Sequence, residues 1–177
     1  QLAHFIARAL QRAAFIDEIT REAATDSLTG LANRSTFLAA LNGSNAATAD
    51  TDNVGAVVLY VGLDGVTRIN HAFGQTVGDE VLRNIGHRLS VTCGAQDVAA
   101  RVGGAEFAVL MRSSTLTDLP AVRDHVVTEL QKPIDSSAGI VTVGAACGTA
   151  AVGAGDLAEA VVADIGRIGN DRGEGAT

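Results

Sequence analysis

The chain has 177 residues, of which 47% are hydrophobic and 19% are charged, so it can enclose one hydrophobic core and is too short for two domains of ordinary size. Its net charge of −7 and the absence of any lysine and arginine cluster argue against a nucleic-acid polymer as partner. No apolar stretch is long enough to span a membrane, and the N-terminus lacks a signal-peptide pattern.

Residues 1–24 predict a helix, because neither glycine nor proline occurs there and apolar residues follow spacings of four and three. The seam consists of Leu2, Ile6, Ala9, Ala13, Ile16, Thr20 and Ala23. This spacing is typical of a coiled coil. Three heptads with alanine or threonine at four positions also fit one amphipathic helix packed on its own domain.

Residues 37–63 predict a short helix, a loop and then a buried strand. A short helix through residues 37–41 ends near residues 42–43 and precedes an exposed polar loop over residues 44–53. Residues 54–63 form a nearly continuous apolar run, typical of a strand that is buried on both faces. We expect this strand at the centre of a sheet.

The second half of the chain continues the alternation of helices and strands. We expect a helix over residues 77–89, a hairpin over residues 98–101 and 107–111, a helix over 116–130, a strand over 140–149 and a helix over 157–168. This order predicts an α/β sandwich with a central mixed β-sheet flanked by helices.

A double-glycine turn joins the two hairpin strands. It runs through Gly103, Gly104, Ala105, Glu106 and Phe107. Paired glycines let a backbone approach a ligand closely, and an acid at such a turn can hold a divalent metal on the phosphates of a ligand. Taken alone, the turn is more often a plain structural hairpin.

Three further motifs accompany this turn, at residues 26–34, 70–74 and 77–83. Their sequences are Asp-Ser-Leu-Thr-Gly-Leu-Ala-Asn-Arg, Asn-His-Ala-Phe-Gly and Val-Gly-Asp-Glu-Val-Leu-Arg. In this order and spacing the four motifs resemble the GGDEF domains of the diguanylate cyclase family, from about Asp26 to about Asn170. The resemblance implies a nucleotidyl-cyclase-like fold over residues 25–177. It also implies a signalling helix over residues 1–24, through which the chain would form a homodimer.

A diguanylate cyclase joins two GTP molecules, each held by one subunit, into cyclic di-GMP. The resemblance places Asn70 and Asp79 at the guanine base and Gly103 and Gly104 at the nucleotide. An Asp can accept hydrogen bonds from the base and an amide can meet its remaining edge. The alternative is a helix-capping Asn70 and a surface Asp79.

Several charged groups of the family pattern are missing. Gly62 stands where the family has its first metal-binding acid, so Glu106 is the retained metal ligand and Asp64 the nearest substitute. We therefore expect weak or absent Mg²⁺ binding. Ala105 replaces an acid with a role in the chemistry and can neither take a proton nor hold a metal. Thr67 stands where the family has a lysine.

The C-terminal phosphate-binding lysine is also missing, with Arg167 as a partial substitute. The inhibitory product site of the family is Arg-x-x-Asp, whereas residues 94–97 read Gly-Ala-Gln-Asp. Without the arginine, cyclic di-GMP is not expected to bind there.

Three hypotheses about function follow. The leading one is a degenerate GGDEF domain that is catalytically inactive and regulatory, and that binds GTP through Asn70 and Asp79. The first alternative is a slow diguanylate cyclase that uses Asp64, and the second is an interaction module without nucleotide. If Ala105 were an engineered substitution, it would explain the missing acid at the turn but not the missing metal-binding acid at Gly62. Because the chain begins at Gln1 and its only methionine is Met111, we expect a part of a longer cytoplasmic or membrane-anchored protein.

Overall fold

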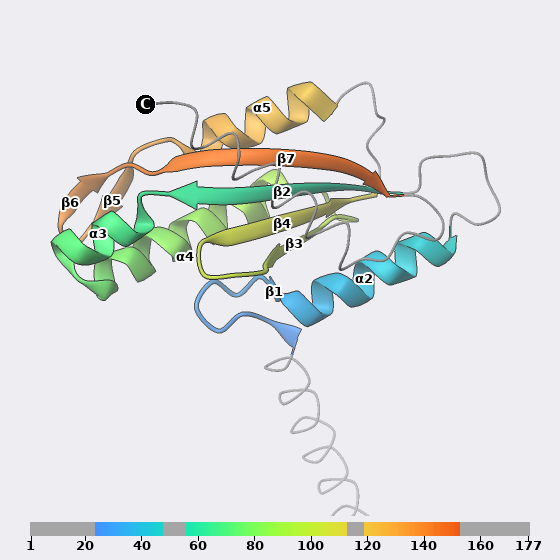
Figure 1. The fold of residues 1–177 in the computed structure, drawn as a ribbon, viewed down its shortest axis with the longest axis horizontal. Coiled ribbons are helices and arrows are strands. Elements are labelled where there is room, and N and C mark those ends of the chain that lie inside the picture. Colours follow the sequence, from blue (N-terminus) through green and yellow to red (C-terminus); the bar gives the residue numbers. More distant parts are fainter. Residues whose placement is uncertain (1–23, 48–55, 113–118, 153–177) are drawn as a thin grey trace, which may run out of the picture.

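The computed structural model describes residues 24–47, 56–112 and 119–152 (Figure 1). The expected helix over residues 157–168, and the expected helix over residues 1–24 except for its last residue, lie outside these ranges. The helices and strands are β1 (Ala32–Asn33), α2 (Arg34–Ala47), β2 (Ala56–Asp64), α3 (Val66–Phe73), α4 (Gln75–Thr92), β3 (Val98–Arg101), β4 (Glu106–Met111), α5 (Leu119–Leu130), β5 (Ile134–Ser136), β6 (Gly139–Val141) and β7 (Gly144–Val152).

The main sheet has five strands in the order β1-β3-β4-β2-β7. The pairing of β1 with β3 is parallel and the other pairings are antiparallel, so the sheet is mixed, as the sequence predicts. Strand β2 lies inside the sheet with its first six residues buried, whereas β4 occupies the middle position that we expected for β2. The two-residue strand β1 extends the sheet beyond β3 and so shifts its centre.

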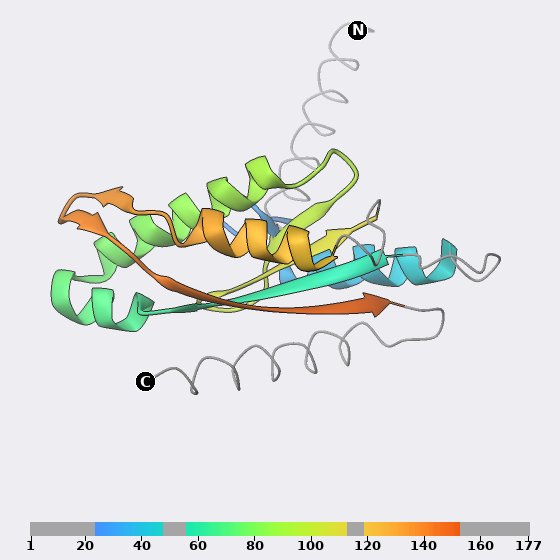
Figure 2. The same ribbon diagram turned by 90° about the horizontal axis from the view of Figure 1, so that it is seen from above.

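Helices cover both faces of this sheet. Figure 2 shows α4 and α5 on one side of it, where Ile85 and Leu130 pack with Leu59 in the larger hydrophobic cluster. Helix α2 covers the other face, where Phe37 packs with Tyr60 in a second cluster. The alternation of side chains along β2 divides its apolar residues between the two cores. Within the described residues, none of the helices is both long and apolar enough to cross a bilayer.

Helix α2 is longer than the sequence predicts. It continues through Asn42 and Gly43 to Ala47, so Ser44 belongs to the helix instead of an exposed loop. Ser44 is buried; its hydroxyl donates to the Ala40 carbonyl over 3.0 Å and accepts a hydrogen bond from Arg112 Nε over 3.2 Å. These contacts with the preceding helical turn and with Arg112, directly after β4, outweigh the weak helix propensity of Asn42 and Gly43.

Two further predictions need correction. The strand expected over residues 140–149 is divided into β6 and β7, and the unpredicted strand β5 pairs with β6 in a separate hairpin. Gly139 has a φ of 102°, a left-handed conformation that favours glycine and makes this tight hairpin accessible. Helix α3 was not predicted from the sequence, although Val66 and Ile69, its buried residues, follow a helical spacing of three.

The two cysteines, Cys93 and Cys147, are free thiols. Cys147 is buried and Cys93 is half-buried. Burial disfavours the thiolate and raises the pKa of Cys93 to about 11 and that of Cys147 to about 12.

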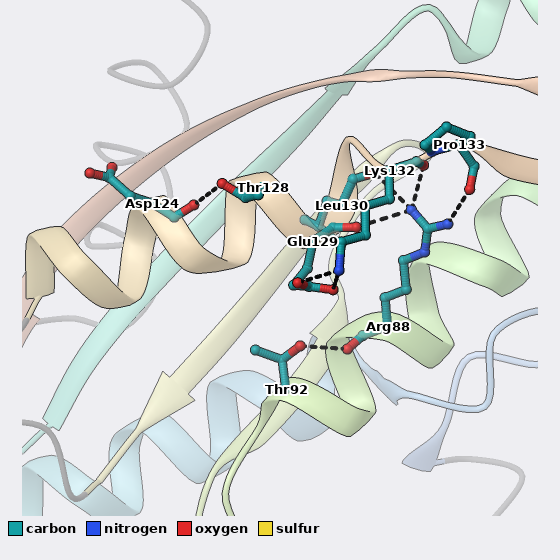
Figure 3. A network of polar contacts seen from close by, with 8 residues as sticks. All are labelled: Arg88, Thr92, Asp124, Thr128, Glu129, Leu130, Lys132 and Pro133. Carbon is teal, nitrogen blue, oxygen red and sulfur yellow. Dashed lines mark hydrogen bonds and ion pairs between the residues drawn. The ribbon is translucent and has the colours of Figure 1, made fainter.

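Arg88 of α4 closes the C-terminal end of α5 (Figure 3). Its Nη1 donates to the carbonyl oxygens of Glu129, Leu130 and Lys132 over 3.0, 3.3 and 2.6 Å, and its Nη2 donates to that of Pro133 over 2.6 Å. The last carbonyls of a helix have no partner within the helix. One guanidinium therefore satisfies the helix end and anchors the chain that leads into β5.

We expect Arg88→Ala to lower the free energy of unfolding by about 2–3 kcal/mol, because the carbonyls that it serves lose a charged donor. Urea denaturation followed by circular dichroism measures this change. Arg83→Ala is the matched control, since Arg83 lies exposed on the same helix, and should change stability by less than about 0.5 kcal/mol. Equal effects of the two substitutions would contradict the anchoring role of Arg88.

Candidate nucleotide-binding site

The motif at residues 26–34 forms a closed loop against α4. The Asp26 carboxylate accepts hydrogen bonds from the Thr29 backbone N–H over 2.9 Å and from its hydroxyl over 2.7 Å. Asn33 ends the loop as a cap of α2, accepting from the Thr36 backbone N–H over 3.0 Å. A Cβ atom at Gly86 would lie 2.9 Å from the Thr29 Cβ, so α4 approaches this loop as closely as glycine allows.

Arg101 joins this loop to the double-glycine turn. Its Nη1 lies 3.2 Å from Asp26 Oδ1, while Nε and Nη2 donate to the Gly104 carbonyl over 3.1 and 2.7 Å. The Arg101 and Asp26 side chains are 15% and 23% exposed, so solvent screens the ion pair little. Partial burial raises the pKa of Asp26, but the hydrogen bonds from Thr29 and the charge of Arg101 outweigh it and hold this pKa below its usual value.

The turn is also bonded to the end of β2. Leu63 N donates to the Ala105 carbonyl over 2.9 Å, and Val102 N donates to the Glu106 carbonyl over 2.9 Å. In the pairing of β2 with β4, Gly62 lies directly opposite Glu106. The structure therefore brings together the two positions that the family pattern assigns to metal ligands, and glycine at one of them provides no carboxylate.

The Glu106 carboxylate is engaged inside the fold. Its side chain lies over Gly103, where an added Cβ would overlap Glu106 Oε2 and displace the carboxylate. It also forms a hydrogen bond with the hydroxyl of Tyr60, which is 6% exposed. Burial, followed by the Glu106 charge, raises the pKa of Tyr60 well above its ordinary value, so Tyr60 is the neutral donor.

The other expected metal ligand, Asp64, is exposed at the end of β2 and is paired elsewhere. The side chain of Asp64 is 86% exposed and forms an ion pair over 3.7 Å with Arg68, one helical turn further on. In the part of the chain that the structure describes, no group of three or more His, Cys, Asp or Glu side chains is placed to hold a metal ion.

Asn70 and Asp79 lie on two short-linked helices, α3 and α4, which Figure 1 shows packed together at one end of the sheet. Gly74, with a φ of 90°, makes the turn between them. The Oδ1 atom of Asn70 is buried and has no hydrogen-bond partner among the described residues. It lies against Gly78, where any Cβ would overlap the amide.

The helix-capping alternative for Asn70 is wrong, because Asn70 lies within α3 and glycines occupy the positions at both helix ends. Asp79 follows Gly78 and is half-buried, not a fully exposed surface residue. Asn70 and Asp79, which the family pattern assigns to the guanine base, therefore lie on the same pair of helices. The Oδ1 atom of Asn70 is buried there without a hydrogen-bond partner among the described residues.

The remaining sequence candidates lie apart from this helix pair. Asp97 accepts from Gly94 N over 2.9 Å and from Arg112 N over 3.1 Å, so its carboxylate closes the far end of the β3–β4 hairpin. Thr67 is exposed in the first turn of α3. Arg167 lies outside the described residues.

Sequence reasoning missed the roles of Arg101 and Tyr60. The signal for Tyr60 was present: it is the only tyrosine of the chain and interrupts an otherwise apolar strand. A hydroxyl buried in a sheet needs a hydrogen-bond partner, and this requirement points to a polar residue on the neighbouring strand. Arg101 gave no comparable signal, since its partner Asp26 lies 75 residues away.

Comparison with known proteins agrees with this arrangement. Residues 23–167 match the family model described as diguanylate cyclase, GGDEF domain. The response regulator PleD of Caulobacter vibrioides is 37% identical over 112 residues, which cover 63% of this chain and 24% of PleD. Diguanylate cyclase TpbB of Pseudomonas aeruginosa is 34% identical over 122 residues, covering 68% of this chain and 28% of TpbB. The chain thus spans about a quarter of the length of these relatives.

Solved structures show the same fold. The coiled coil and GGDEF domain of DgcB from Caulobacter crescentus, in complex with c-di-GMP, superimposes with a TM-score of 0.87 at 22% identity, covering 99% of this chain and 93% of that one. The GGDEF domain of TpbB from Pseudomonas aeruginosa gives a TM-score of 0.75 at 29% identity, covering 84% of this chain and 89% of that one.

The lowered pKa of Asp26 predicts an acid-dependent loss of stability. The carboxyl of the unfolded chain titrates near pH 4, so the stabilisation by Thr29 and Arg101 is fully present above about pH 4 and is lost as the pH falls through the lower pKa of the folded state. At pH 7, Asp26→Asn should reduce the free energy of unfolding by about 1–2 kcal/mol.

Urea denaturation of both proteins at several pH values between 7 and 2.5 measures this difference. It should be constant from pH 7 to 5 and shrink below pH 4. The comparison isolates Asp26, because Glu80 and Glu129, whose pKa values are lowered by hydrogen bonds from Ser137 and Lys132, are present in both proteins. A difference that does not change with pH would mean that the Asp26 charge is not involved.

Proposed function

The chain belongs to the GGDEF domain family of diguanylate cyclases, and on this basis we propose that it is a catalytically inactive, regulatory domain of a cyclic di-GMP signalling protein that binds GTP. The observation that carries the proposal is the buried, unpaired amide oxygen of Asn70, beside Gly78 and next to Asp79. An unsatisfied buried acceptor costs about 1–3 kcal/mol, and a ligand that donates a hydrogen bond to it removes that cost.

Guanine is the base that these side chains suit. Its Watson–Crick edge presents two neighbouring N–H donors, which a carboxylate such as that of Asp79 can accept together. Adenine presents a ring acceptor at the corresponding position, which the carboxylate would repel. Asn70 can accept from the remaining donor of guanine, so the pair favours guanine over adenine.

The site lacks charged groups that the cyclase reaction needs. Phosphoryl transfer depends on positioning and on stabilisation of charge by metal ions and cations. Ala105 provides no acid, Gly62 provides no ligand opposite Glu106, and Thr67 provides no cation. The fold around these positions is retained, which supports a role in binding and regulation without turnover.

The proposal also covers the oligomeric state of the protein and the compartment in which it acts. We propose a homodimer through residues 1–24, whose heptad spacing is that of a coiled coil. The DgcB structure that shares this fold contains a coiled coil together with its GGDEF domain. A domain that responds to GTP would act in the cytoplasm, where GTP is found.

Calorimetric titration of GTP into the purified chain tests the binding. We expect saturable binding with a Kd of about 0.1–1 mM, the range that a few base contacts support. Asn70→Ala should weaken binding about tenfold or more. Asn84→Ala is the matched control, because Asn84 also carries a buried unpaired Oδ1 but lies five residues beyond Asp79 on α4. Equal loss in both variants would contradict base recognition by Asn70.

Incubation with GTP and Mg²⁺, followed by chromatography, tests the absence of turnover. We expect no cyclic di-GMP even at high protein concentration. The retained Glu106 favours slow cyclase activity as the second candidate, and product that disappears in Glu106→Ala would establish it. If neither binding nor product is found, the interaction module is the function that remains.

A further inference from the structure

We propose that nucleotide recognition by this domain is confined to the guanine base, so that binding needs no divalent cation and does not distinguish GTP from GDP. This inference rests on the proposed function and names the ligand class of the same site. It follows from how the acids and cations around the double-glycine turn are already used within the fold.

The residues at the turn do not fit the Mg²⁺ ion that the family implies. Magnesium requires near-ideal octahedral coordination and is bound by carboxylates together with substrate phosphates. Glu106 is the single carboxylate between β2 and β4, because Gly62 lies opposite it. Asp64 is turned outward to Arg68, and the described part of the chain holds no cluster of three potential ligands.

Tyr60 makes Glu106 still less available. Its hydroxyl is bonded to the Glu106 carboxylate, and its ring is packed in the cluster beneath α2. If Glu106 turned toward a metal ion, the Tyr60 hydroxyl would lose its partner in apolar surroundings, at a cost of about 1–3 kcal/mol. The hydrogen bond with Tyr60 therefore restricts the orientation of the Glu106 carboxylate and leaves fewer of its lone pairs for a metal ion.

Two of the cations near the turn are also engaged. Arg101 serves Asp26 and the Gly104 carbonyl, and Arg68 forms an exposed ion pair with Asp64. Arg34 is exposed, and its charge acts on the ionisation of Tyr60. The groups left for a phosphate chain are the exposed Arg34 guanidinium and backbone N–H groups at the start of α3, and attractions of this kind are each about 0.3–1 kcal/mol.

These assignments have a quantitative consequence. An attraction of about 0.3–1 kcal/mol changes a dissociation constant by about two- to fivefold. The Kd values of GTP and GDP should therefore agree within about fivefold, and replacement of Mg²⁺ by EDTA should change either value by less than about fivefold.

The experiment is a calorimetric titration of the full chain with GTP, GDP and ATP, each in Mg²⁺ and in EDTA. We expect similar Kd values for GTP and GDP in both buffers and no binding of ATP. Binding of GTP that is ten or more times tighter than that of GDP, or that requires Mg²⁺, would overturn this inference and leave the proposed function intact. Absence of binding by both guanine nucleotides would overturn both.

Gly62→Asp supplies the second arm, because the strand pairing places the new carboxylate opposite Glu106. Gly62→Asn is the matched control with the same shape and no charge. With Mn²⁺ alone as the probe, we expect saturable binding to Gly62→Asp, at least fivefold tighter than to Gly62→Asn or the unchanged chain. Tight Mn²⁺ binding by the unchanged chain would overturn the inference. If Gly62→Asp does not fold, the nucleotide titrations decide alone.

Discussion

The pairing of β2 with two neighbouring strands determines where the residues of the double-glycine turn lie relative to Gly62 and Asp64. Strand β2 pairs with β7 from Ala56 to Asp64 and with β4 from Val57 to Gly62. A shift of one residue in either pairing would turn the apolar side chains of β2 to the wrong face, so both hydrophobic cores hold this register in place. The same register sets Gly62 opposite Glu106. The burial of aliphatic side chains in the sheet thus controls the geometry of a polar site at the end of its strands.

The two parts of that site, the base side at Asn70 and the double-glycine turn, are held by different forces. The turn can therefore lack charged side chains while the fold stays intact. The base side depends on close packing, since Asn70 lies against a glycine of α4. The turn depends on polar contacts with backbone atoms: Arg101 binds the Gly104 carbonyl, and Leu63 N binds the Ala105 carbonyl. Because the fold uses the backbone of Ala105 and not its side chain, replacement of an acid by alanine leaves these described contacts unchanged.

Strong, local signals in the sequence were sufficient for most of the fold. The apolar run of β2, the helical period of α4 and the paired glycines of the hairpin each specify their element within a short window. Asn70 and Asp79 are identified by their motifs, and the α3–α4 turn brings their helices together, with Asn70 against Gly78. The rest depends on distant contacts: Ser44 stays helical because Arg112 reaches it, and Glu106 is occupied because Tyr60 lies on the next strand. Periodicity carries no information about such pairs.

The hairpin formed by β5 and β6 is a separate sheet whose polar anchors lie on α4. Arg88 holds the chain that enters it, and Glu80 accepts a hydrogen bond from Ser137 N over 2.8 Å at its turn. Glu80 directly follows Asp79, so the hairpin is attached to the same helical turn as the candidate base-binding carboxylate. A displacement of the hairpin turn would therefore act on the helical turn of Asp79 through the Glu80 side chain, so the position of the hairpin and that of the candidate base-binding carboxylate are coupled.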